Sequence, residues 1–225
     1  MTFADSLQRY SDNIAIITES GHEVSYAALD ERVDSFAESI VYPKAKQLIF
    51  LSAGNNLASI IAYLYCLKNR HAVMLLSPEL FCADLSKNES QAWLDQLIQL
   101  YRPNALIKTD NTEPTYHRLS NDDLILHDDL ALLLSTSGST GSPKQVRLSY
   151  INIQSNADAI TKFLGLSHSE RAITTLPLHY SYGLSVLNSH LLVGASIVLT
   201  EHSIVTRDFW NMFKEQGATS IAGVP

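Results

Sequence analysis

The segment from Leu130 to Tyr150 constrains the fold of this chain more than any other. It begins with the apolar run Leu130 to Leu134, which has the length and composition of a strand buried on both faces. A loop of Gly, Ser and Thr with one Pro follows over residues 136–143. Residues 144–148 then alternate polar and apolar side chains, which indicates a half-exposed strand rather than a helix. The segment therefore predicts a strand, a glycine loop and a second strand.

The composition of this loop suits the binding of a polyphosphate. Familiar phosphate loops place their glycines before a helix N-terminus, and no helix is predicted here. Backbone N–H groups, hydroxyls and the Lys144 ammonium could still form a concave set of donors. The Walker pattern fails because Gly138 and Gly141 are only three apart and Gln145 follows the lysine. The nucleophile elbow fails because Gly138 directly precedes Ser139. A surface turn of small residues remains the alternative.

Residues 136–144, TSGSTGSPK, resemble the T-S-G-[ST]-T-G-x-P-K signature of the adenylate-forming superfamily. That superfamily includes acyl-CoA synthetases, luciferases and the adenylation domains of peptide synthetases. The resemblance implies a loop between two strands that holds the β- and γ-phosphates of ATP while a carboxylate attacks the α-phosphorus. The nucleotide-binding residues it implies are Thr136, Ser137, Gly138, Ser139, Thr140, Gly141 and Lys144. Ser135 departs from the pattern, since the family usually has Tyr or Phe there.

Strand and helix patterns alternate along the rest of the chain. Strands are predicted over 14–18, 23–25, 47–52, 72–76, 105–108, 171–176, 196–200 and 219–222, and helices over 26–40, 57–68, 89–101, 152–164, 185–193 and 207–216. A strand, a helix and a strand at this spacing form a right-handed unit with parallel strands. We expect one α/β domain over residues 1–225, a mostly parallel sheet with flanking helices. The resemblance makes it the first subdomain of the adenylate-forming enzyme fold.

Three helices carry informative apolar faces. The helix over 57–68 is apolar nearly all round, which predicts a position between two layers. The faces predicted to point inward are Trp93, Leu94, Leu97 and Leu100 on the helix over 89–101, and Phe209, Trp210 and Phe213 on the helix over 207–216. His71 lies at the end of a helix, where a capping role is favoured over a ligand role.

The segment from Pro177 to Leu184 resembles the family's P-x-x-H-x-x-G stretch, which lines the acyl pocket. Counted from Pro177, the position that gates this pocket falls on Tyr180, with His179 beside it. The resemblance thus implies a substrate pocket that includes His179, Tyr180, Tyr182 and Gly183. The residues alone show no carboxylate partner for His179, which favours a packed or capping histidine over a general base.

Composition excludes several classes of protein. The formal net charge of −7 and the lack of any Lys/Arg run argue against nucleic acid as a partner. The N-terminus has no secretory pattern, and the apolar run over 57–67 is far too short to span a bilayer. Cys66 and Cys82 lack C-x-x-C spacing, so reduced thiols in a cytoplasmic protein are expected. The aspartate pairs at 122–123 and 128–129 are interpreted as solvated turns rather than as a metal site.

The resemblance covers essentially the whole chain but only the first part of the family's architecture. It places an adenine-binding segment, a Y-G-x-T-E motif that holds Mg²⁺ and a domain with the catalytic lysine after the matched region, and this sequence has none of them. We therefore expect the N-terminal piece of an ATP-dependent acid:AMP ligase that is inactive alone. Coenzyme A or a carrier-protein thiol would accept the activated acid. The alternative is a natural module that binds without catalysis, but the end directly after a strand favours truncation.

Overall fold

The computed structural model describes residues 2–41, 45–81, 88–109, 112–120, 124–135 and 145–224. Its strands form two sheets, each mostly parallel. The expected mostly parallel α/β architecture with flanking helices is thus confirmed. The sequence predicted one sheet, whereas the strands are divided between two.

The six-stranded sheet has the order β6-β5-β3-β4-β7-β8. Its parallel strands are β3 (Leu48–Ser52), β4 (Ala72–Leu76), β5 (Ala105–Lys108) and β7 (Leu130–Ser135), while β6 (Thr115–Arg118) and β8 (Gln145–Ser149) run antiparallel at the edges. The five-stranded sheet has the order β11-β9-β10-β1-β2. It contains the parallel strands β1 (Ile14–Ile17), β9 (Arg171–Ile173), β10 (Ser196–Val198) and β11 (Ser220–Ile221), with β2 (Glu23–Ser25) antiparallel.

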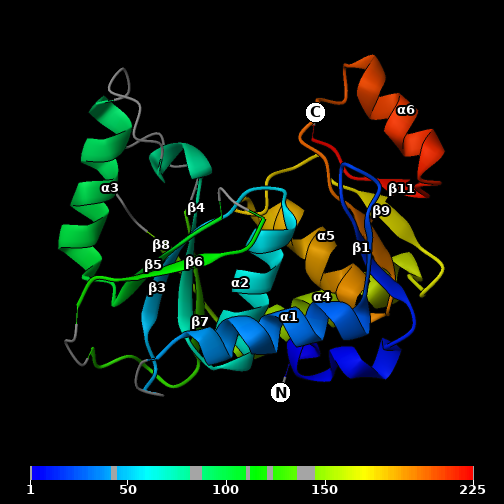
Figure 1. Cartoon of the computed structure of the whole chain (residues 1–225). Coiled ribbons are helices and arrows are strands. Elements are labelled where there is room, and N and C mark those ends of the chain that lie inside the picture. Colours follow the sequence, from blue (N-terminus) through cyan, green and yellow to red (C-terminus); the bar gives the residue numbers. More distant parts are fainter. Residues whose placement is uncertain are drawn as a thin grey trace.

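Helices separate and cover the two sheets (Figure 1). Between the sheets lie α1 (Tyr26–Ser39), α2 (Leu57–Lys68), α4 (Tyr150–Leu164) and α5 (Ser181–Leu192). The outer face of the six-stranded sheet carries α3 (Asn88–Tyr101), and that of the five-stranded sheet carries α6 (Arg207–Glu215). Two short 3-10 helices, η1 (Phe3–Tyr10) and η2 (Pro78–Phe81), complete the described elements. The result is a stack of five layers, helix, sheet, helix, sheet and helix.

Successive side chains of a strand point to opposite faces of its sheet, so the apolar side chains of one strand are divided between the two helix layers that cover the sheet. In β3, Ile49 and Leu51 belong to the central core, while Leu48 and Phe50 pack on the side of α3. This is the period of two expected for a sheet that is covered on both faces. Helix α2 contributes buried side chains all round, from Ala58 to Leu67. The predicted position of this helix between two layers is confirmed.

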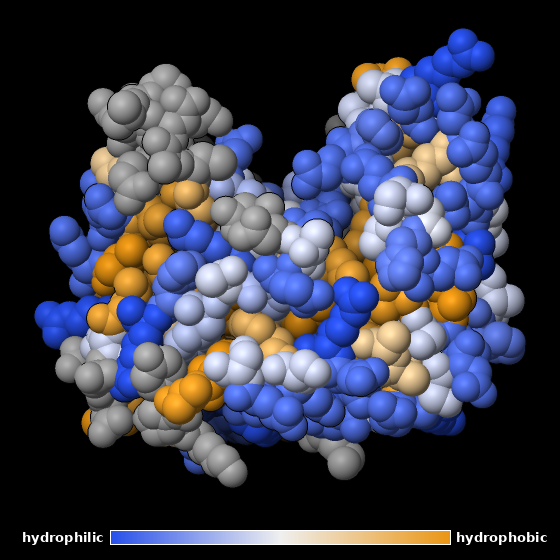
Figure 2. Space-filling view, viewed as in Figure 1, coloured by the Kyte–Doolittle hydropathy of each residue, from blue (hydrophilic) through white to orange (hydrophobic). Residues whose placement is uncertain are grey.

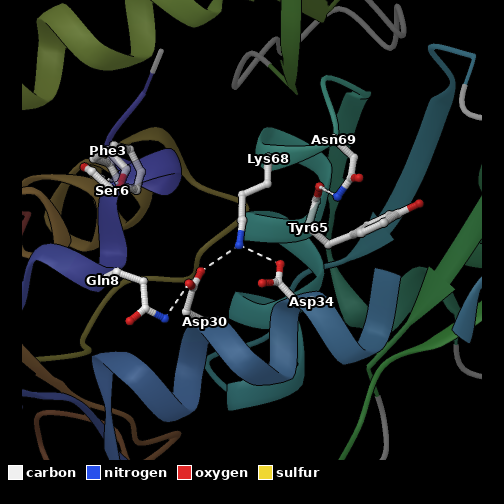
Figure 3. Close-up of polar contacts among 8 residues, drawn as sticks. All are labelled: Phe3, Ser6, Gln8, Asp30, Asp34, Tyr65, Lys68 and Asn69. Atoms are coloured by element: carbon white, nitrogen blue, oxygen red, sulfur yellow. Dashed lines mark hydrogen bonds and ion pairs between the residues drawn. The ribbon is translucent and has the colours of Figure 1, made fainter. Parts of the chain in front are cut away.

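The C-terminal end of α2 carries an ion-pair cluster that joins three elements of the central layer (Figure 3). Lys68 Nζ lies 2.7 Å from Asp30 Oδ1 and 2.6 Å from Asp34 Oδ1, both on α1. Gln8 of η1 donates a 2.8 Å hydrogen bond to the other oxygen of Asp30. Burial lowers the pKa of Lys68, but the hydrogen bonds to the two carboxylates outweigh it and leave this pKa above its usual value.

Two inward-facing residues were predicted wrongly. Leu100 is 59% exposed, because it lies about 240° around the helix from Leu94, and Tyr101 packs inward instead. Trp210 is 43% exposed, and its indole N–H donates to the Ile204 carbonyl at the rim of α6.

Element boundaries were also corrected by the structure. The strand β6 was not predicted, since its short sequence TYHR has little apolar periodicity and its pairing with β5 is a tertiary contact. Helix α5 begins at Ser181, four residues before the predicted start at Ser185. Strand β9 ends at Ile173 rather than at residue 176.

His71 is a buried bridging residue. Its backbone N–H donates to the Cys66 carbonyl at 2.9 Å and closes the C-terminal end of α2, which agrees with the predicted capping role. The imidazole has further partners: Nδ1 accepts a 3.2 Å hydrogen bond from the Gln47 N–H, and Nε2 lies 3.2 Å from the Tyr65 hydroxyl. Burial is the main cause that lowers the pKa of His71 to about 4, and the Lys46 charge adds to it.

We predict that His71 makes the fold sensitive to mild acid. The unfolded chain takes up this proton near the ordinary pKa of about 6.5, while the native state resists protonation until about pH 4. The free energy of unfolding should therefore fall as pH drops through this window, by on the order of 2–3 kcal/mol. In urea titrations between pH 7 and pH 4, His71→Gln should reduce this slope.

His168→Gln provides the control, because His168 is exposed and should leave the slope unchanged. Some slope remains in both variants, since burial also lowers the pKa of His190. Equal slopes in His71→Gln and the unmodified chain would contradict the prediction.

Candidate functional site

The candidate site is a crevice where the parallel strands of both sheets end. Segments that follow β3 and β4 of one sheet face segments that follow β9 and β10 of the other. The surface is hollowed between the part that carries η2 and the part that carries α6 (Figure 2). In open α/β sheets, ligands bind in the crevice outside the carboxyl ends of the strands. The position alone therefore marks this crevice as the place to look for chemistry.

The crevice has a volume of about 430 Å³. Its lining comes from four segments: Ala53, Gly54 and Asn55; Ser77, Pro78 and Glu79; Thr174, Thr175, Pro177 and His179; and Thr200, Glu201, His202 and Ser203. The described lining residues include two carboxylates and no lysine or arginine. A phosphate bound nearby would therefore need a positive charge from outside this described set.

A hydrogen-bond network fixes the turn after β3. Ser59 Oγ accepts from the Gly54 N–H at 3.0 Å and lies 2.9 Å from Thr109 Oγ1. Thr109 in turn donates a 2.6 Å bond to the Ser52 carbonyl at the end of β3. Asn56 caps α2 by accepting from the Ser59 N–H at 2.8 Å, and its amide donates to the Thr109 carbonyl at 3.1 Å. This turn is a rigid wall of the crevice.

The glycine loop connects the ends of two paired strands. Strand β7 ends at Ser135 and β8 begins at Gln145, and their side chains hydrogen-bond at 3.3 Å. Both predicted strands are confirmed, and they pair with each other in antiparallel orientation. Strand β7 runs parallel to its neighbour β4, whose carboxyl end lines the crevice. The predicted nucleotide-binding residues, 136–141 and 144, themselves lie outside the described residues.

His179 reaches across the crevice from one sheet to the other. Its Nδ1 lies 3.1 Å from the carbonyl oxygen of Ala53, directly after β3. A carbonyl oxygen only accepts, so the imidazole carries its proton on Nδ1 in this contact. The geometry is that of a bridging histidine, which agrees with the packed role that the sequence favoured.

Tyr180 and Tyr182 lie beside the crevice rather than in its lining. Tyr180 occupies the N-cap position of α5 without a capping side-chain bond, and Tyr182 is in the first turn. Their side chains are 43% and 42% exposed. Gly183 is buried one residue further on, against the backbone carbonyls of Leu176 and Pro177. Of the four predicted pocket residues, only His179 faces the crevice.

No group of three or more His, Cys, Asp or Glu side chains within the described residues could hold a metal ion. Asp128 and Asp129 are exposed and lie in a turn directly before β7, as the sequence predicted. The other pair, at residues 122–123, lies outside the described part of the chain.

Sequence reasoning missed four residues that line the crevice or support its wall. Asn55, Ser59, Thr109 and Glu201 come from three different segments, and none belongs to a motif that was singled out. A signal was nevertheless present, because Gly54-Asn55-Asn56 directly follows a buried strand and precedes a helix. The carboxyl end of a parallel strand followed by a helix N-cap is a common position for binding residues.

The chain matches a known family over nearly its whole length. Residues 3–225 match the family model described as "AMP-binding enzyme". Over 109 residues the chain is 36% identical to an oxalate–CoA ligase of Arabidopsis thaliana; the aligned region covers 47% of this chain and 21% of that protein. Over 201 residues the chain is 26% identical to a 2-succinylbenzoate–CoA ligase of Bacillus cytotoxicus; here the aligned region covers 84% of this chain and 40% of that protein.

Solved structures share the fold. ATP-bound MatB from Rhodopseudomonas palustris aligns with a TM-score of 0.73 and 20% identity, over 100% of this chain and 50% of that one. The N-terminal subdomain of NpsA from Klebsiella oxytoca aligns with a TM-score of 0.74 and 18% identity, over 97% of this chain and 58% of that one. At these identities the likeness concerns the fold alone. The chain spans about half the length of these solved chains and two-fifths or less of the two curated relatives. No helix within the described residues is long and apolar enough to cross a membrane.

We predict that Gly183→Ala displaces His179. A Cβ atom at residue 183 would lie 2.7 Å from the Leu176 carbonyl oxygen and closer still to that of Pro177. Because both neighbours are backbone atoms, the segment that carries His179 must move. The expected cost is about 1–3 kcal/mol in the free energy of unfolding, measured by urea denaturation. The imidazole signals of His179 should shift in ¹H–¹³C spectra.

Gly223→Ala serves as the control, since a Cβ there would meet no atom within 4 Å. Unchanged stability and unchanged His179 signals in Gly183→Ala would show that the first turn of α5 is not held by this close approach.

Proposed function

We propose, from the premise that the chain belongs to the family of AMP-binding enzymes, that it supplies the phosphate-binding half of an ATP-dependent acid:AMP ligase. The reaction has two steps. A carboxylate oxygen attacks the α-phosphorus of ATP and pyrophosphate leaves, which gives an acyl-adenylate. A thiol such as that of coenzyme A then attacks the acyl carbon, and AMP leaves.

The position of the two strands that flank the glycine motif carries this proposal. Strand β7 ends at Ser135 beside β4, and β4 leads directly into the wall of the crevice. ATP held by residues 136–144 would therefore have its phosphates beside the described crevice. The curated relatives, whose names are those of CoA ligases, support the same class of reaction.

The charge of the crevice supports a special role for Lys144. The described residues of the crevice lining include no lysine or arginine, whereas pyrophosphate accumulates negative charge as it leaves. An ammonium beside the departing oxygens lowers the energy of that transition state more than that of the bound ATP. The hydroxyls of Thr136, Ser139 and Thr140 would donate hydrogen bonds to the same phosphates.

His179 is proposed to shape the acid pocket together with Tyr180, Tyr182 and Gly183. Its bond to Ala53 links the two walls of the crevice and orients the first turn of α5. The two exposed tyrosines on that turn then offer aromatic and hydroxyl surface to an acid. A direct general-base role for His179 is not part of this proposal, because its described partner is a backbone carbonyl.

ATP would be the cosubstrate, and the resemblance assigns Mg²⁺ and the catalytic lysine to motifs that residues 1–225 do not contain. Within the described residues, no group of three or more His, Cys, Asp or Glu side chains could hold this ion. Loss of one group that stabilises the charge of the transition state, such as this lysine or the metal ion, commonly slows a reaction by about 10²–10³-fold. We therefore expect residues 1–225 alone to show no measurable adenylation.

The test separates the two half-reactions in a full-length enzyme that carries residues 1–225. Lys144→Ala and Thr140→Val should each slow acid-dependent ATP–pyrophosphate exchange by on the order of 10–10³-fold. Transfer of a preformed acyl-adenylate to its thiol should change little, because pyrophosphate has already left. Lys162→Ala, at an exposed position in the last turn of α4, is the matched control and should leave both rates unchanged.

The proposal would be wrong if both half-reactions slowed together in Lys144→Ala. It would also be wrong if stability fell while the exchange rate did not, since Lys144 would then be a packing residue.

A further inference from the structure

Two small cavities lie directly behind the first turn of α5, the part of the chain to which the proposed acid pocket belongs. The cavity on the side of the five-stranded sheet has a volume of about 10 Å³, and its lining comes from β9, β10, α5 and the segments that follow β9 and β11. A cavity needs about 10–15 Å³ to hold one water molecule. Thr174 and Thr175 line both this cavity and the crevice, so the two spaces adjoin. The acid pocket thus has almost no room to extend toward the five-stranded sheet.

The second cavity lies between α5 and the six-stranded sheet. It has no volume that a water molecule could enter. Its lining comes from β3, β4, α2, α5 and the segment before α5, and it includes Ala53, whose carbonyl oxygen is the partner of His179. The space directly behind the His179 bridge is therefore filled as well.

Two leucines close both cavities. Leu178 and Leu187 line the one as well as the other, and their side chains are buried in the central core. Leu178 directly precedes His179, and Leu187 lies one turn after Gly183 on the same face of α5. Because a close-packed core leaves such side chains little freedom to move, they set the depth of any pocket that opens at the first turn of α5.

The crevice itself is a poor surface for a long apolar chain. Its volume of about 430 Å³ is toward the lower end of the usual range for small-molecule pockets, and its described lining carries five hydroxyl side chains, two histidines and two glutamates. An apolar chain that covered these groups would remove their water without offering hydrogen bonds, which is unfavourable. A chain laid on the exposed Tyr180 and Tyr182 instead would stay in contact with water within the described part of the protein.

We propose that the ligase to which this chain contributes activates short-chain acids, and that Leu178 and Leu187 set the upper limit of chain length. The inference rests on the function proposed above and adds its substrate class. A short substituent fits beside His179 and the crevice threonines. Each further methylene must either displace a buried leucine or lie among polar groups. Leu178 and Leu187 are thus specificity-determining residues, although neither was part of the predicted pocket.

The first test is the acid dependence of ATP–pyrophosphate exchange in a full-length enzyme that carries residues 1–225. The acids are acetate, propanoate, hexanoate and octanoate. The value of kcat/KM should fall from propanoate to hexanoate by at least about tenfold, because a single methylene in a pocket commonly changes this ratio by about 10–200-fold. Octanoate should support no measurable exchange.

Leu187→Ala should move this limit. It shortens a side chain that both cavities share, so kcat/KM for hexanoate should rise at least about tenfold relative to kcat/KM for propanoate. Leu191→Ala is the matched control, because it makes the same truncation one turn further along α5 at a buried residue that lines neither cavity. The control should leave the ratio unchanged. Circular dichroism checks that each variant is folded, and Leu187→Val is the milder variant if Leu187→Ala does not fold.

Exchange with hexanoate or octanoate that is as fast as exchange with propanoate in the unmodified enzyme would overturn this inference and leave the ligase proposal intact. An equal change of the ratio in Leu187→Ala and Leu191→Ala would do the same, since it would reflect a general loosening of the core. A lack of exchange with acids of every length would instead overturn the proposed function, and this inference with it.

Discussion

The burial of helix α2 between two sheets is the constraint on which the rest of the structure depends. Its residues from Ala58 to Leu67 are all buried, and its neighbours in the central core come from both sheets. Burial of one large aliphatic or aromatic side chain is worth about 1.5–3 kcal/mol. A helix that is apolar all round gains this only if both sides are covered. The shared helix layer therefore holds the two sheets face to face, and the groove above it follows from that arrangement.

Polar groups at the two ends of α2 determine where this apolar helix starts and stops. At its C-terminal end, Lys68 binds two carboxylates of α1, and the buried His71 braces the start of β3. At its N-terminal end, Asn56 and Ser59 connect the helix to β3 and to Thr109. The same hydrogen bonds that satisfy the helix ends also fix the wall of the crevice. Stability and site geometry thus rest on one set of contacts.

Charge is unevenly distributed at the site. The described lining of the crevice carries two carboxylates and no lysine or arginine, whereas the one lysine of the glycine motif belongs to the segment between β7 and β8. Under the proposed function, Lys144 would therefore supply the positive charge that the phosphates need. Such an interaction is strong only in a groove whose walls restrict the access of water.

Much of the fold could be predicted from local patterns. The bounds of α2 and of β4 were predicted to the residue, because continuous apolar runs end at clear signals such as Asn56 and Ser77-Pro78. The face of α3 was partly wrong at Leu100, and β6 was missed. Both errors share a cause, since the partner surface decides which residues at the margin of an apolar stripe are covered and which short polar segments pair.

The sequence by itself determined the order of elements and the family, because apolar periodicity and the TSGSTGSPK loop are local signals that need no partner. It also located the candidate phosphate-binding residues. These lie between Ser135 and Gln145, outside the described residues. Only the tertiary structure decided that the strands divide between two sheets, that His179 meets Ala53, and that Asn55 lies beside Glu201. These residues are more than a hundred positions apart in the chain. Contacts over such separations arise from how whole layers pack, which no local pattern encodes.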